Sequence, residues 1–190
     1  AVALGIGLSA SAGFRVFIPM LVASVAAHFN ILPTTESFVW LGSWTAMITF
    51  GVATVVEVLA YYVPFVDNLL DTVTTPMAVG AGTLLMTSVL PVDNELMKWI
   101  MGFVVGGGAA ATMQSGSVLS RLTSSKFTAG TANPVVSTGE NVAALGSSVL
   151  ALFMPILVAI VFVLLAFVIF VKLFQWRKHK KTKKESSMHG

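Results

Sequence analysis

The stretch that decides the class of this protein is VAALGSSVLALFMPILVAIVFVLLAFVIFV, residues 142–171. No charged side chain occurs between Glu140 and Lys172. A transmembrane α-helix needs about 20 mostly apolar residues to cross a hydrocarbon core of about 30 Å. At about 1.5 Å of rise per residue, this run is longer than a membrane is thick. The sequence therefore predicts a membrane-spanning helix here that tilts, bends at Pro155 or projects from the bilayer.

The rest of the 190-residue chain has the same apolar character. Hydrophobic residues make up 56% of it and charged residues only 10%, and the mean hydropathy is +0.88. In soluble domains roughly a quarter of all residues are charged. The sequence contains no cysteine, so disulfides, thiolate metal sites and thiol nucleophiles are excluded. This composition indicates a membrane protein and excludes a water-soluble enzyme.

Apolar segments bounded by charges, prolines or polar clusters predict about five spans within a transmembrane domain of residues 1–176. The expected ranges are 1–29, 41–63, 76–92, 96–119 and 142–171. We therefore expect an all-α, polytopic helical membrane protein. Basic residues just beyond the last span favour the cytoplasm, which places the C-terminus inside and, with five spans, the N-terminus outside.

The positive charge of the chain is concentrated in its tail. Residues 1–171 hold four basic and seven acidic side chains, whereas residues 172–190 hold seven basic and one acidic. The high pI therefore describes a short tail, and nucleic-acid binding is not expected. We expect residues 177–190 to be a disordered basic tail that faces anionic lipid headgroups.

The first apolar segment contains a charged residue near its middle. Arg15 follows the small residues 9–13 and precedes Pro19, which has no N–H to donate to the carbonyl of Arg15. These features predict a broken first helix, and a guanidinium at such a break is a suitable binding point for an anion or a carboxylate. The alternative is a buried ion pair between Arg15 and Glu57, which lies in the second segment, that only fixes helix packing.

Two polar clusters follow. Asp67, Asn68 and Asp71 supply hard oxygen donors, and the two aspartates share one face of a helical turn. They suit a cation or a proton relay, or they belong to an ordinary loop or helix cap. Gln114 and Arg121 form, with Ser117, a polar stripe that must face protein or water, so it lines a solvated cavity or holds helices together.

Several local patterns predict helix starts and close packing. Thr75–Pro76 and Asn133–Pro134 each place a capping side chain before a proline at the first helical position, and residues 137–140 fit a capping box. Small residues at intervals of four predict close approach of helices: Gly5, Ser9, Gly13, Ala78, Gly82, Gly102 and Gly106.

The chain also has a possible two-fold internal repeat. Glu57 is followed by Pro76 after 19 residues, and Gln114 is followed by Pro134 after 20 residues. Internal repeats combined with broken helices are typical of transporters. The alternative is a chance similarity between two apolar hairpins.

Three motifs carry a resemblance to a known family: LSASAGFRVFIP at residues 8–19, EVLA at 57–60 with DNLLD at 67–71, and NPVVS at 133–137 with Glu140. The chain resembles the small bacterial integral-membrane proteins catalogued as "domain of unknown function 4126", over nearly its whole length apart from the tail. It departs from them at Tyr61–Tyr62 and at Asn141, where the family carries charged residues. The resemblance implies a fold, a bacterial inner membrane and one shared site for the motif residues, but no activity.

We expect a small membrane transporter or channel for an ion or small polar solute. Its substrate- or ion-binding centre is predicted to comprise Arg15, Glu57, Asp67, Asn68, Asp71, Gln114, Arg121, Asn133, Ser137 and Glu140. The acidic side chains Glu57, Asp67 and Asp71 are expected to hold cations or protons, with Arg15 and Arg121 as counter-charges.

The remaining expectations concern partners. We expect a homo-oligomer in the lipid bilayer, joined through its glycine faces, with no cofactor, no assigned metal and no enzymatic activity. The alternative function is that of a non-enzymatic accessory or assembly subunit of a larger membrane complex, in which the buried charges merely lock helices together.

Overall fold

The computed structural model describes the backbone of residues 1–128 and 133–186, and the side chains of residues 1–63, 70, 72–124 and 134–172. Within these ranges the chain is α-helical and contains no strand. In chain order the elements are α1 (Val2–Ser11), α2 (Phe17–His28), the 3₁₀-helix η1 (Glu36–Gly42), α3 (Trp44–Ala60), α4 (Pro64–Val89), α5 (Glu95–Met101), the π-helix η2 (Gly102–Gly107), α6 (Gly108–Thr128), α7 (Asn133–Phe153) and α8 (Pro155–Ser186).

Several of these helices meet the physical requirements for crossing a membrane. The segments Glu95–Ser124, Pro134–Phe153 and Pro155–Lys172 are long and apolar enough to span a bilayer. The pair η1 and α3, bent by 61°, meets the same requirement as one element. Three or four of the described helices therefore qualify. The predicted class of polytopic helical membrane protein is confirmed, and the expected number of about five spans stays a prediction.

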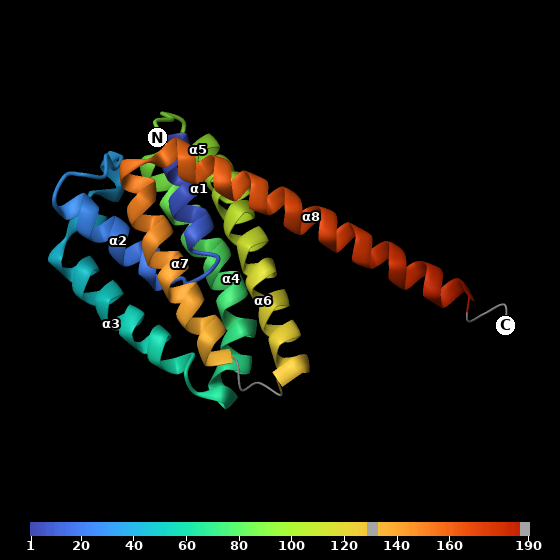
Figure 1. Ribbon diagram of the computed structural model, residues 1–190. Helices are drawn as coiled ribbons and strands as arrows, with labels where there is room; N and C mark the ends of the chain where they lie inside the picture. The colour runs from blue at the N-terminus through green and yellow to red at the C-terminus, as the bar shows by residue number, and fades with distance from the viewer. Residues whose placement is uncertain (129–132, 187–190) are drawn as a thin grey trace.

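The first apolar segment is broken in two, as its sequence predicts. α1 ends at Ser11 and α2 begins at Phe17. In Figure 1 the chain enters from the N-terminus, turns about halfway through the bundle and leaves in a different direction. α1 packs against α4, α7 and α8, whereas α2 packs against α3, η1 and α7. We call residues 12–16, which connect the two half-helices, the tip. This tip places its backbone and Arg15 in the interior of the bundle.

Glycines allow α4 and η2 to pack backbone against backbone. A Cβ atom on Gly82 would lie 2.6 Å from the carbonyl oxygen of Gly106, and one on Gly102 would overlap Thr87. At the tip, a Cβ on Gly13 would lie 2.5 Å from the carbonyl oxygen of Ala110. The predicted close packing is confirmed. These glycines are occupied inside one molecule, and the expectation of a homo-oligomer joined through glycine faces stays a prediction.

Two predicted helix starts are wrong. α4 begins at Pro64, so this proline lies in its first turn. The helix continues through Pro76, which lies inside it and does not begin a helix. Residues 137–140 lie within α7, which already begins at Asn133, so they form no capping box. Within the described residues α7 begins at Asn133, next to Pro134. Residues 129–132 lie outside the described backbone, so the predicted start at Asn133–Pro134 stays a prediction. A proline inside a helix leaves one backbone carbonyl without its helical N–H donor. Inside a membrane bundle, neighbouring helices can supply another hydrogen-bond donor, so such a proline is tolerated.

The long apolar run from residue 142 to 171 is not one helix. α7 ends at Phe153 and α8 begins at Pro155, because a proline is readily placed in the first turn of a new helix but disfavoured inside one. α8 then leaves the bundle (Figure 1) and continues to Ser186. Residues 177–186, expected to be disordered, are therefore helical.

The possible internal repeat corresponds to two helical hairpins, α3–α4 and α6–α7. Within them, Pro76 lies in the middle of α4 whereas Pro134 is the second residue of α7. The prolines that suggested the repeat thus occupy different helical positions, and the repeat itself stays a prediction.

Candidate functional site

Glu57 of α3 fastens the tip. Its Oε1 accepts a hydrogen bond from the backbone N–H of Val16 at 2.8 Å, and its Oε2 accepts one from Phe17 at 2.9 Å. These N–H groups open α2 and have no partner within the helix. A carboxylate at this position also interacts favourably with the positive end of the helix dipole. Glu57 is only 6% exposed, so these two hydrogen bonds are shielded from solvent.

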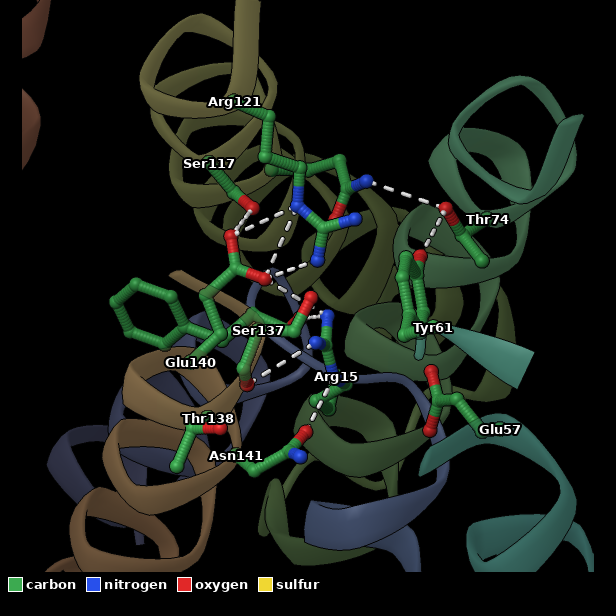
Figure 2. Close-up of polar contacts among 12 residues, drawn as sticks. Arg15, Glu57, Tyr61, Thr74, Ser117, Arg121, Ser137, Thr138, Glu140 and Asn141 are labelled. Atoms are coloured by element: carbon green, nitrogen blue, oxygen red, sulfur yellow. Dashed lines mark hydrogen bonds and ion pairs between the residues drawn. The ribbon is translucent and has the colours of Figure 1, made fainter. Parts of the chain in front are cut away.

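Arg15, at the tip, is anchored mainly to α7 (Figure 2). Its Nη1 forms an ion pair with Oε2 of Glu140 at 2.9 Å, and its Nε donates to Oδ1 of Asn141 at 2.6 Å. Nη2 donates to the carbonyl of Ser137 at 3.2 Å, and Nη1 also donates to the carbonyl of Phe14 at 3.1 Å. The predicted alternative of an Arg15–Glu57 ion pair is therefore wrong. The acidic partner of Arg15 comes from α7 instead.

Glu140 is shared between two arginines. Arg121 of α6 donates from Nε to Oε1 at 3.2 Å and to Oε2 at 3.1 Å, and its Nη2 forms an ion pair with Oε2. The hydroxyl of Ser117, one turn earlier on α6, donates to Oε1. All these side chains are buried. This carboxylate therefore joins the tip, α6 and α7 through charge-assisted hydrogen bonds, which are the strong ones.

Tyr61 completes the site from the end of α3. The Cζ atoms of Arg15 and Arg121 lie 3.8 Å and 4.2 Å from the centre of its ring, which is within the range of cation–π interaction. Its hydroxyl donates to Oγ1 of Thr74 at 3.1 Å, and Nε2 of Gln114 donates to the same atom at 3.3 Å. Figure 2 shows Tyr61 and Thr74 on the opposite side of the arginines from Glu140. We call this whole set of contacts the charged centre.

The charged centre contains much of the predicted site. It brings together six predicted residues: Arg15, Glu57, Gln114, Arg121, Ser137, through its carbonyl, and Glu140. The side chains of Asp67, Asn68, Asp71 and Asn133 lie outside the described residues. The prediction missed Tyr61, Thr74 and Asn141. Tyr61 had one usable signal, since it follows Glu57 by one helical turn and shares its face.

The polar stripe on α6 holds helices together, which is one of the two purposes considered for it, and Ser117 also borders a cavity. Arg121 and Gln114 bond to side chains of other helices. Ser117 and Ser120 line a cavity of about 330 Å³ bounded by α6, α7, α8 and the tip residue Phe14. The cavity also reaches Glu140, so the edge of the charged centre is accessible from it.

The arrangement pairs one buried carboxylate with two buried guanidiniums. An added anion competes with Glu140 for the two guanidiniums, and an added cation competes with the guanidiniums for the carboxylate. Among the described residues, no group of three or more histidine, cysteine, aspartate or glutamate side chains is placed to hold a metal ion.

The fold and the charged centre define a multi-pass helical membrane protein with a buried ionic cluster at a helix break. The chain belongs to the family described as domain of unknown function DUF4126, whose model matches residues 2–175. The resemblance inferred from the motifs is thereby confirmed. No curated protein and no solved structure matches the chain.

Proposed function

We propose that this protein is a small membrane transporter or channel for an ion or small polar solute, and that the charged centre is where the solute is bound. The observation that carries the proposal is the convergence of Glu57, Arg121 and Glu140, from three helices, on the tip of a broken first helix. Half-helices that end near the middle of a bundle form binding sites in known classes of transporter.

The energetics of the charged centre favour this proposal. An arginine or aspartate at the middle of a membrane helix costs about 2.5–3.5 kcal/mol on insertion scales, and such residues are functional by default. Packing in the bundle does not always need charges, because α4 and η2 approach closely through uncharged residues such as Gly82 and Gly106. Burying the charged side chains of the centre therefore costs free energy that helix packing by itself does not explain, which favours a binding role for them.

Rearrangement of these contacts provides a mechanism. A bound anion takes the place of Glu140 on Arg15 or Arg121, and the tip then loses its ion pair with α7, while Asn141 and Ser137 still bind Arg15. A bound cation or proton neutralises Glu140 or Glu57 and weakens the same contacts. Glu57 holds the start of α2 directly, so its neutralisation frees that half-helix. Asp67 and Asp71 remain in the proposal as cation or proton sites on the strength of the sequence.

The cellular setting is part of the proposal. We place the protein in the bacterial cytoplasmic membrane as a homo-oligomer, with the C-terminus in the cytoplasm. The basic residues 177–184 support this orientation, because such residues close to a span favour the cytoplasmic side.

A second function is favoured by one specific observation. Arg15 uses three nitrogens to bond to Glu140, Asn141, Ser137 and Phe14, all of them fixed parts of the same chain. Such saturation is what a purely structural arginine requires. It supports the alternative of a non-enzymatic accessory or assembly subunit.

The decisive experiment measures tracer flux into proteoliposomes over Na⁺, K⁺, Mg²⁺, Ca²⁺, H⁺, Cl⁻ and phosphate. The wild type is compared with Glu140→Gln, which keeps the shape of the side chain and removes its charge. The matched control is Glu95→Gln, because Glu95 is exposed and bonds only to Ser37 and Lys98 among the described residues. Each variant is checked for folding by circular dichroism.

Flux that is lost in folded Glu140→Gln and retained in Glu95→Gln supports transport through the charged centre. Unchanged flux in Glu140→Gln contradicts it. If folded wild type moves none of these solutes and co-purifies with one stoichiometric partner, the accessory-subunit function is correct.

A further inference from the structure

The cavity beside the charged centre has two unlike ends. Its walls come from the apolar side chains of Met113, Leu165 and Ile169, on α6 and α8. Its polar end is formed by Ser117, Ser120 and Glu140. A volume of about 330 Å³ is at the lower limit of pockets that hold small organic ligands. An amphiphile, with one polar and one apolar end, fits such a lining.

The polar end accepts hydrogen bonds and has no spare donor among its described side chains. The hydroxyl of Ser117 already donates to Glu140, and that of Ser120 donates to the carbonyl of Gly116 at 3.0 Å. A hydroxyl oxygen retains acceptor lone pairs after it donates, and a carboxylate only accepts. A ligand group placed here must therefore donate a hydrogen bond.

Among the described residues, the polar end carries no unbalanced charge. Glu140 is the one charged residue of the described lining, and its carboxylate is already paired with Arg15 and Arg121. An ammonium group would meet two guanidiniums behind the carboxylate. A carboxylate or phosphate group would meet Glu140 and two hydroxyls whose protons are engaged. A neutral hydroxyl is the head group that this end accommodates best.

Space for a hydrocarbon chain adjoins the cavity. A second cavity of about 340 Å³ shares Phe14, Ala143 and Leu165 with the first and continues between α7 and α8. Its lining includes Leu157, Phe162 and other apolar side chains. α8 leaves the bundle toward the C-terminus (Figure 1). Both cavities are lined by residues of α8, among them Leu165, so they lie along the helix that diverges.

We propose that the two adjoining cavities form a binding site for a neutral, hydroxyl-bearing lipid of the monoacylglycerol class. The hydroxyl group donates to Ser117, Ser120 or Glu140, and the acyl chain lies between α7 and α8. This site does not depend on the transport proposal, because the lipid leaves the ion pairs of Glu140 in place.

The test is photo-crosslinking in phosphatidylcholine nanodiscs that contain the full chain. The probe is a monoacylglycerol with a diazirine in its acyl chain, and labelled residues are mapped by mass spectrometry. Two further probes carry the same chain on a carboxylate and on an ammonium head group. We expect the monoacylglycerol probe to label α7 and α8, unlabelled monoacylglycerol to compete, and the two charged probes to label the site more weakly.

Variants make the test specific. Gly139 lines the first cavity, and a Cβ there meets no heavy atom within 4 Å, so Gly139→Leu fills the space. Gly80→Leu is the matched control, because a Cβ on Gly80 also meets nothing within 4 Å and its α4 position lies outside both linings. We expect labelling to be lost in Gly139→Leu and kept in Gly80→Leu.

A milder variant removes one hydrogen bond without filling the cavity. Ser120→Ala should weaken competition by monoacylglycerol about three- to tenfold, the value of one hydrogen bond. The proposal is overturned if Gly139→Leu and Gly80→Leu are labelled equally. It is also overturned if the carboxylate or ammonium probe labels the site as strongly as the monoacylglycerol probe.

Discussion

The charged centre and the contact between α4 and η2 are both buried in one bundle, but different interactions stabilise each of them. At the contact, Gly82 and Gly106 bring two backbones together without any charge. At the centre, Arg15, Glu57 and Glu140 join four segments through ion pairs and charge-assisted hydrogen bonds. Inside a membrane, small residues provide a tight interface because backbones then gain dispersion contacts.

This difference indicates which part of the molecule is able to move. A glycine interface has one arrangement, since any displacement opens a gap that no side chain fills. An ion cluster has several arrangements, because a solute or a proton can replace one of its members. In the proposed function, the α4–η2 contact serves as the rigid frame, and the charged centre is the part expected to respond to a ligand.

The largest expected effect comes from Glu140→Leu. It leaves the guanidiniums of Arg15 and Arg121 buried without their acidic partner, and breaking a buried pair costs about 3–5 kcal/mol. Unfolding by SDS titration in mixed micelles measures the change. A loss below about 1 kcal/mol, the value of an exposed pair, would mean that water reaches the centre freely.

Glu57→Gln is expected to come next. The amide keeps one acceptor oxygen but turns its NH₂ group toward a backbone N–H of Val16 or Phe17. Hydrogen bonds to a charged group contribute about 1.5–3 kcal/mol, so the loss should fall in this range. Faster hydrogen exchange at the first turn of α2, with α4 unchanged, is the accompanying signature. Equal exchange at the first turn of α2 in Glu57→Gln and wild type would show that Glu57 does not hold the tip.

Gly82→Ala tests the frame. Its Cβ would lie 2.6 Å from the carbonyl oxygen of Gly106 and 2.7 Å from the Cβ of Ala110, so α4 and η2 must separate. Such overpacking costs about 1–3 kcal/mol. The control is Gly80→Ala on the same helix, where a Cβ meets nothing within 4 Å. Equal stability of the two variants would contradict a glycine-determined interface.

The smallest effect is expected on α8. Leu164 is 60% exposed, and substitutions at such positions usually change stability by less than about 0.5 kcal/mol. Leu164→Ala should therefore leave the unfolding free energy unchanged. If the variant instead shifts the oligomer distribution in nanodiscs, α8 is where copies of the chain meet. The apolar face of α8 would then be a third kind of contact, beside the charged centre and the α4–η2 contact.

Sequence reasoning predicted the fold class and the break in the first helix because both depend on local features. An apolar run is recognisable in one dimension, and Arg15 with Pro19 marks a place where a membrane helix is interrupted. Reasoning failed at Pro76, because a proline before an apolar run looks like a helix start. It failed also in residues 177–186, where basic composition suggested disorder and α8 continues as a helix.

Within the site, the identity of most partners was not predictable. The sequence placed Arg15, Glu57, Arg121 and Glu140 in or beside apolar segments, and that alone determined that they must find polar partners inside the protein. Only the tertiary structure decided that Glu57 binds backbone N–H groups and that Glu140 serves both arginines. The physical reason is that hydrophobicity and helix breaks are properties of neighbouring residues, whereas contacts between residues 19 to 125 positions apart depend on how the helices pack.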